Sequence, residues 1–140
     1  MAKPVSGHVI ICGYGTLGEK VADVLSGHNI PFRLIEIDTK KATRARELGY
    51  NVIEGDATRS QVLKSANIAG ARAVAIALDD DAKNLFTVLT ARDLNKKLFI
   101  AARANDEFVR EKLIEAGADY IVMPQMAASR EIINELLKPE

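Results

Sequence analysis

The sequence predicts an α/β fold built on one doubly wound, six-stranded parallel sheet, with strand order 3-2-1-4-5-6 and helices on both faces. Six apolar runs typical of strands alternate with segments of helical spacing along the chain. Several of these runs are almost continuously apolar, as expected of parallel strands that are covered on both faces. Since 140 residues are enough for one such domain, we expect a single domain over residues 1–140.

The first half of the chain contains three expected strands, at residues 8–12, 32–37 and 51–54. The helix after the first strand carries apolar residues at helical spacing, at Leu17, Val21, Val24 and Leu25. Thr39 can cap the start of the second helix, and Gly49 stands at its end, where positive φ is favoured. A third helix is expected after Thr58, which can serve as its N-cap.

The second half contains the other three strands, at residues 73–78, 98–102 and 120–123. Gly70 and Gly117 stand at helix-to-strand joints of the same form as Gly49, while residues 67–71 form a short irregular segment. Asp106 can cap the fifth helix. The apolar positions of the fourth and fifth helices are Leu85, Phe86, Leu89, Val109, Leu113 and Ile114.

A last helix is expected over about residues 126–137. Its apolar face consists of Ile132, Ile133, Leu136 and Leu137. Three placements remain open for it, because chain ends need not dock. The helix packs back on the sheet, reaches a partner, or meets a missing C-terminal segment.

Composition excludes several classes of function. Nineteen basic residues balance nineteen acidic ones without a run of Lys or Arg, which argues against a nucleic-acid or anionic-membrane partner. The single cysteine, Cys12, allows no internal disulfide and lies in an apolar run, as expected of a buried thiol in a reducing compartment. With no apolar run near the roughly 18 residues of a membrane span and no apolar signal segment at the start, we expect a cytoplasmic protein.

The segment GYGTLG, residues 13–18, is the strongest motif for binding. It places Gly13, Gly15 and Gly18 in the G-x-G-x-x-G spacing between a strand and a helix, which is typical of Rossmann-like nucleotide sites. In such sites the first glycine permits a tight turn, the second lets the backbone approach a pyrophosphate, and the third allows close helix–strand packing. Taken alone, the three glycines are also consistent with a packing role.

An acidic residue at the end of the second strand supports the binding interpretation, since such a residue binds ribose hydroxyls. Glu36 and Asp38 both fit the spacing and lie on one face of the strand. We favour Glu36, because Asp38 can instead cap the second helix. Either carboxylate would repel a 2′-phosphate, so a free 2′-hydroxyl is preferred. Lys40, Lys41 and Arg44 are near enough to soften this repulsion, although a solvated helix face is the preferred interpretation of these three residues.

Two further strands end in polar residues that we expect beside the glycine loop, because the carboxyl ends of parallel strands share one edge. The third strand ends in GDAT, residues 55–58, and the fifth in ARAND, residues 102–106. Asp56 binds a ribose or base, or is a turn residue. Arg103 neutralises a phosphate, or pairs with an acid in residues 79–81.

Six segments together resemble the N-terminal lobe of RCK domains, also called TrkA-N or KTN domains. They are HVIICGYGTLG, LIEID, EGDATRSQVLKSANI, DDDAKNLFTVLTARDLN, IAARAND and AGADYIVMP, and the resemblance covers about residues 7–137. It implies a regulatory domain on the cytoplasmic side of a potassium channel or transporter. It also implies assembly as a homodimer or an octameric ring, and binding of NAD or NADH first, with ATP, ADP or AMP as alternatives.

Carried over by position, the resemblance implies that the three glycines face the phosphates and that Glu36 binds the ribose. Asp56 and Ala57 would flank the adenosine, Arg103 would lie near phosphate, and Asn84 would anchor the fourth helix. The full candidate set for nucleotide binding is Gly13, Tyr14, Gly15, Thr16, Leu17, Gly18, Glu36, Asp38, Asp56, Ala57, Thr58 and Arg103.

The chain departs from the resembled family in two respects. Calcium-gated members place acids where this chain has Ala77, Arg103 and Asn105, so we expect no metal site there. The C-terminal lobe of RCK domains is expected to be absent, which suggests a one-lobe protein or a piece of a larger channel subunit.

A regulatory function is favoured over catalysis. A dehydrogenase needs a proton donor or base near the nicotinamide, but His8 and His28 are expected at the far end of the sheet, and no histidine is placed to activate Cys12. We therefore expect no catalytic residue, with a fragment of an NAD-dependent oxidoreductase as the alternative. The expected dimer surface lies on the fourth and fifth helices, with Leu85, Phe86, Val88, Leu89 and Phe108. The alternative is that these apolar residues are simply covered by the sheet.

Overall fold

The computed structural model describes residues 6–139, so residues 1–5 and 140 of the expected domain lie outside the described residues. The elements of the first half are β1 (Val9–Cys12), α1 (Thr16–Gly27), β2 (Phe32–Glu36), α2 (Thr39–Glu47), β3 (Val52–Glu54), α3 (Ser60–Ser65) and the 3-10 turn η1 (Ile68–Gly70). The second half comprises β4 (Ala73–Ile76), α4 (Asp81–Leu94), β5 (Phe99–Arg103), α5 (Glu107–Ala116), β6 (Tyr120–Val122) and α6 (Pro124–Leu136).

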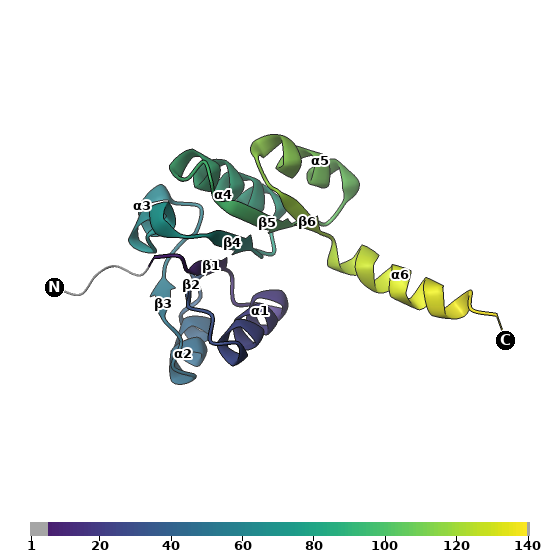
Figure 1. Cartoon of the computed structure of the whole chain (residues 1–140), viewed down its shortest axis with the longest axis horizontal. Coiled ribbons are helices and arrows are strands. Elements are labelled where there is room, and N and C mark those ends of the chain that lie inside the picture. Colours follow the sequence, from purple (N-terminus) through teal and green to yellow (C-terminus); the bar gives the residue numbers. More distant parts are fainter. Residues whose placement is uncertain (1–5, 140) are drawn as a thin grey trace.

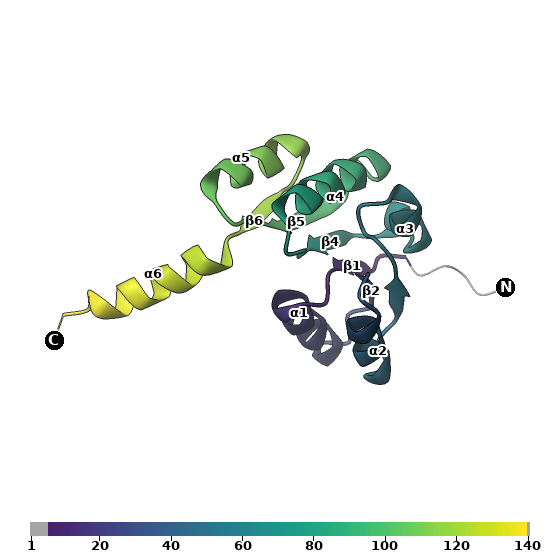
Figure 2. The same cartoon turned by 180° about the vertical axis from the view of Figure 1, so that it is seen from behind.

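The six strands form one parallel sheet in the order β3-β2-β1-β4-β5-β6, which confirms the predicted fold class. Helices α1 and α2 cover one face, whereas α3, α4 and α5 cover the other (Figures 1 and 2). The chain leaves β1 toward β2 on one side and returns to β4 on the other, so the strand order reverses beside β1. Ligands bind outside the carboxyl ends of the strands at such a point.

The two faces of the sheet explain the continuous apolar runs. Ile10 and Cys12 of β1 belong to the core under α3, α4 and α5. Val9 and Ile11, whose side chains alternate with these, belong to the core under α1 and α2. A central strand of this sheet therefore has no solvent-facing side.

The helix starts differ in part from the sequence prediction. Asp106 caps α5 as predicted, because its carboxylate accepts the N–H of Val109. The prediction for Thr39 is wrong, since Asp38 caps α2 instead. The prediction for Thr58 is also wrong. Its N–H and hydroxyl both donate to Asp56 in a local turn, and α3 begins two residues later.

The glycines at the helix ends are also only partly as predicted. Gly49 and Gly117 have φ values of +85° and +116°, which confirms the prediction of positive φ. Gly70 does not have positive φ. Asn67 holds the left-handed conformation there, with φ of 55°, and Gly70 closes the 3-10 turn η1 inside the segment expected to be irregular.

Helix α6 extends away from the sheet in both views (Figures 1 and 2). Only Met123 separates it from β6, and none of its described residues is buried. Of the three placements left open by the sequence, packing back on the sheet is therefore not observed. Within residues 6–139, no helix is both long and apolar enough to cross a lipid bilayer.

Candidate functional site

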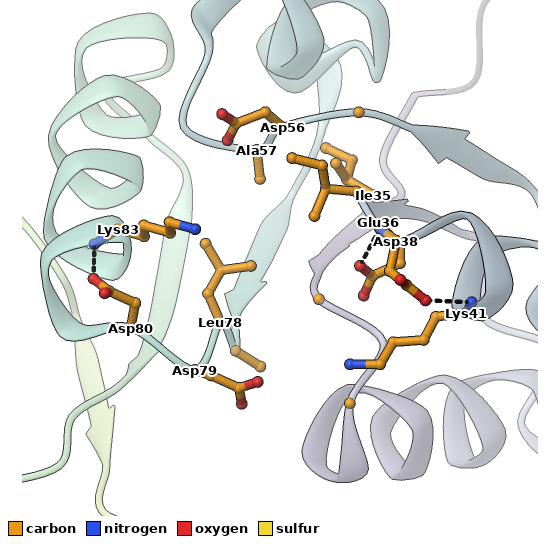
Figure 3. Close-up of a pocket in the computed structure, with 15 residues that line it drawn as sticks. Ile35, Glu36, Asp38, Lys41, Asp56, Ala57, Leu78, Asp79, Asp80 and Lys83 are labelled. Carbon is orange, nitrogen blue, oxygen red and sulfur yellow. Dashed lines mark hydrogen bonds between the residues drawn. The ribbon is translucent and has the colours of Figure 1, made fainter.

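A cavity of about 200 Å³ opens at the carboxyl ends of β1, β2, β3 and β4 (Figure 3). It is lined by Gly13, Gly15, Ile35, Glu36, Ile37, Asp38, Lys41, Gly55, Asp56, Ala57, Ala77, Leu78, Asp79, Asp80 and Lys83. It thus brings together the glycine loop, the acidic end of β2 and the GDAT segment after β3, which lie far apart in the sequence. This is the edge where the strand order reverses.

The three glycines of the loop have different surroundings. Gly13 has φ of +100°, and a Cβ there would come within 2.8 Å of the Ala77 carbonyl oxygen. Gly18 lies in the first turn of α1, where a Cβ would clash with the Gly13 carbonyl. A Cβ on Gly15 would meet no protein atom within 4 Å. Packing therefore requires the first and third glycines but not the second, which lines the cavity.

Glu36 joins the glycine loop to the end of β2. One carboxylate oxygen accepts the N–H of Tyr14 and the other accepts the N–H of Asp38, each at 2.8 Å. The residue is buried yet lines the cavity. Because each carboxylate oxygen can accept two hydrogen bonds, both oxygens retain capacity for a ligand hydroxyl.

Asp38 has a structural role, as the sequence suggested. Its carboxylate accepts the N–H of Lys41 at 2.9 Å and caps α2. It also lines the cavity mouth. Of the two acids that fit the spacing, only Glu36 is therefore not engaged in capping a helix.

Asp56 holds the GDAT segment in a tight turn. One of its oxygens accepts the N–H and the hydroxyl of Thr58, at 2.9 and 2.7 Å. These bonds lower the pKa of the Asp56 carboxyl below its ordinary value. Asp56 and Ala57 line the cavity, whereas Thr58 does not.

Arg103 does not line the cavity. Its guanidinium lies 3.6 Å from the carboxylate of Asp79, one of the acids with which the sequence allowed it to pair. Asn84 anchors the same region, because its side-chain amide accepts the N–H of Leu78 and donates to the carbonyls of Leu78 and Arg103. The suggested anchoring role of Asn84 in α4 therefore agrees with these bonds.

The other loop residues of the candidate set lie outside this cavity. Tyr14 is fully buried and packs edge-on against Tyr50, so only its backbone N–H serves the site. Thr16 is exposed at the start of α1. Leu17 and Gly18 line a separate apolar hollow between α1 and the β4–β6 part of the sheet.

The two cationic residues of the cavity lining were not among the predicted ligands. Lys41 lies in the first turn of α2 and is half-buried, rather than part of a fully solvated face, while Lys40 is exposed. Lys83 lies in the first turn of α4 and points into the cavity from the opposite wall (Figure 3). Their position just after the ends of β2 and β4 is a signal that sequence analysis could have used.

Neither Cys12 nor His8 lines the cavity. Cys12 is fully buried, and burial raises the pKa of its thiol to about 12, so it stays protonated. The His8 ring is buried and bonds the carbonyl of Ala66 through Nε2. Within residues 6–139, no three His, Cys, Asp or Glu residues are grouped so as to hold a metal ion.

The parallel sheet, its order and the glycine turn between β1 and α1 define a Rossmann-like domain. Within that class, the chain belongs to the TrkA-N domain family, whose model matches residues 9–124.

The chain is similar to parts of several potassium transport proteins. It is 39% identical over 140 residues to Potassium channel protein 1 of Methanocaldococcus jannaschii, and this match covers 99% of the chain and 42% of that protein. It is 32% identical over 138 residues to the Trk system potassium uptake protein TrkA homolog of Pyrococcus abyssi, and this match covers 94% of the chain and 61% of that protein. The chain thus spans less than two thirds of the length of these relatives.

Solved structures support the same assignment. The TrkA-N domain of inner membrane protein ybaL from Escherichia coli superposes with a TM-score of 0.91, at 25% identity, covering 96% of this chain and 98% of that one. The GsuK channel bound to NAD superposes with a TM-score of 0.79 at 26% identity, and the match covers 89% of this chain and 22% of the GsuK chain. The AMP-bound Kef CTD of Shewanella denitrificans superposes with a TM-score of 0.80 at 25% identity, and the match covers 94% of this chain and 82% of the Kef chain.

Proposed function

We propose that this chain is a regulatory domain that senses a nucleotide and thereby controls a potassium channel or transporter. Membership of the TrkA-N family and the names of its relatives support the potassium system. Structural neighbours described as bound to NAD, ADP and AMP support the class of ligand. The partner is the membrane subunit of that system, and the domain acts at the cytoplasmic face of the cell membrane.

The observation that carries the nucleotide assignment is the open space beside Gly15. If the three glycines served packing alone, the middle one would be as crowded as the others. Its Cβ position is instead empty and borders the cavity, while its φ of −86° suits any residue. A ligand that needs close approach to the backbone explains why a glycine stands there.

The remaining lining fits an adenosine phosphate. Backbone N–H groups at the start of α1 face the phosphates, Glu36 accepts from ribose hydroxyls, and Asp56 with Ala57 borders the adenosine. Because the Glu36 carboxylate disfavours a 2′-phosphate, NAD or NADH is the first ligand, and AMP, ADP and ATP share the same adenosine part. The proposed ligand set from the loop also includes Thr16 through its backbone, while Tyr14 contributes indirectly, because its N–H holds the Glu36 carboxylate in place.

Gly15→Ala tests this assignment. We expect its free energy of unfolding to stay within about 0.5 kcal/mol of wild type, because the added methyl group meets no protein atom. We expect its affinity for NAD and AMP to fall at least about tenfold, since the methyl group occupies the position of the phosphates. Urea denaturation measures the first quantity and isothermal titration calorimetry the second.

Two results would contradict the nucleotide-sensing function. One is that no nucleotide among NAD, NADH, ATP, ADP and AMP raises the melting temperature of the wild-type domain at millimolar concentration. The other is turnover of NADH with a simple carbonyl compound, which would favour the oxidoreductase fragment.

We further propose that the ligand acts by changing the assembly of copies, as a homodimer or as a ring of eight. A ligand shifts such an equilibrium by its difference in affinity for the two arrangements, typically about 1–3 kcal/mol. Phe86 and Leu89 of α4 and Phe108 of α5 supply the contact surface, with exposed fractions of 62%, 47% and 70%. Val88, also expected there, is instead buried in the core, and Leu85 packs partly against it.

Phe86→Asp combined with Phe108→Asp is expected to convert the dimer to a monomer, because a carboxylate in an apolar contact loses its hydration. Sedimentation velocity measures the change in mass. Leu48→Asp serves as the control, because Leu48 is 59% exposed at the end of α2, on the opposite face. If the double variant sediments like wild type, the contact does not lie on α4 and α5.

A further inference from the structure

The charges that line the cavity leave few groups to neutralise a phosphate. Five carboxylates line it, from Glu36, Asp38, Asp56, Asp79 and Asp80. Against them stand only two cationic side chains, Lys41 and Lys83, and the lining contains no arginine. An anionic ligand in this cavity therefore depends on a small number of positive charges in addition to backbone N–H groups.

Lys41 is the cation on the side of the glycine loop. Its side chain extends from α2 toward the segment that leads into α1 (Figure 3), and it lines the cavity together with Gly13 and Gly15. Its backbone N–H is bound by Asp38, which fixes the first turn of α2. None of the ion pairs observed within residues 6–139 involves its ammonium group.

Arg103 is less suited to this task. It lies outside the cavity lining and is paired with Asp79. Binding a phosphate would require it to leave that partner and move into the cavity. Lys83 is in the lining but on the opposite wall, beside Asp80 and near Asp56 (Figure 3).

We propose that Lys41 anchors the phosphate of the bound nucleotide against the glycine loop, and that Arg103 instead holds the ends of β4 and β5 together through Asp79. The proposal rests on the proposed nucleotide-binding function and assigns its phosphate contact. An ammonium on a flexible stem can close on a phosphate without a change in the backbone. Lys41 therefore discriminates nucleotides from nucleosides.

The test compares Lys41→Ala with Lys40→Ala in calorimetric titrations with AMP, ADP and adenosine. Lys40 is the matched control, because it is the preceding residue of α2, carries the same charge and does not line the cavity. We expect Lys41→Ala to weaken AMP and ADP about tenfold, as for the loss of one charge-assisted hydrogen bond, and to leave adenosine unchanged. Lys40→Ala should stay within about twofold of wild type, and Lys41→Arg should retain most of the affinity.

Each outcome bears on a different claim. Equal affinities of Lys41→Ala and Lys40→Ala for AMP would overturn the assignment of Lys41. If Arg103→Ala lowered the affinity for AMP tenfold and Lys41→Ala did not, Arg103 would be the phosphate ligand instead. An equal loss for adenosine would show that Lys41 does not act on the phosphate. Failure of the wild-type chain to bind any of these nucleotides would instead overturn the proposed function. Urea denaturation of Lys41→Ala shows that the variant is folded.

Discussion

Gly18→Ala is expected to lower the free energy of unfolding by about 3 kcal/mol. The added methyl group would clash with the Gly13 carbonyl oxygen and lie 2.9 Å from its carbon. This obstacle is backbone in the turn between β1 and α1, so no side chain can rotate away, and either the turn or the helix must shift. The same shift would displace the N–H groups at the start of α1 that we propose as phosphate ligands, so nucleotide affinity should fall as well.

Gly27→Ala is the control for this substitution, because Gly27 is the last residue of the same helix and a Cβ there meets nothing within 4 Å. Alanine has the higher helix propensity, so Gly27→Ala should be neutral or stabilise by about 0.5–1 kcal/mol. Urea denaturation of both variants measures the difference. A Gly18→Ala protein as stable as wild type would mean that α1 does not approach the turn as closely as the structure shows.

The overall fold could be predicted from the sequence because its signals are repeated. Each strand is an apolar run, and an alternation of strands and helices allows few topologies with right-handed connections. The local errors have a common cause. Thr58 and Gly70 are residue types suited to helix caps. The N–H and hydroxyl of Thr58 instead donate to Asp56, and Asn67 rather than Gly70 adopts the left-handed conformation.

The candidate site could be predicted only where the backbone determines position. The glycine spacing and the acid at the end of β2 place Gly15 and Glu36 at one edge of the sheet, and both line the cavity. The directions of long side chains depend on tertiary neighbours that the sequence does not reveal. Lys41 was therefore interpreted as solvated but borders the cavity, and the sequence could not decide between a phosphate and an acid as the partner of Arg103, which pairs with Asp79 in the structure.

Glu36 connects the structural and binding roles of this edge. Its two oxygens fix the N–H of Tyr14 in the glycine loop and the N–H of Asp38 at the start of α2. Lys41 follows in the first turn of α2, so the loop and this cation are both positioned through one carboxylate. A change at Glu36 should therefore affect more than a single contact to ribose.

Glu36→Ala is expected to reduce both stability and affinity. It leaves the N–H groups of Tyr14 and Asp38 without their acceptor, which we expect to lower the free energy of unfolding by about 2 kcal/mol. It also removes the proposed acceptor for ribose hydroxyls, for which each charge-assisted hydrogen bond would contribute about 1.5–3 kcal/mol. Affinity for NAD or AMP should therefore fall about tenfold to a hundredfold. Urea denaturation and calorimetric titration at a temperature where the variant is folded measure the two effects.

Glu54→Ala is the matched control, because Glu54 pairs with Glu36 in the sheet register but makes its contacts, to Thr39 and Arg46, at the surface. Its loss should change stability by less than about 1 kcal/mol and leave affinity unaltered. A Glu36→Ala protein that binds NAD and AMP like wild type would show that Glu36 only holds the loop. Asp38, the other acid on this edge, would then be the candidate for the ribose contact. In that case Asp38→Ala should lower nucleotide affinity by more than the loss of its hydrogen bond to the start of α2 accounts for.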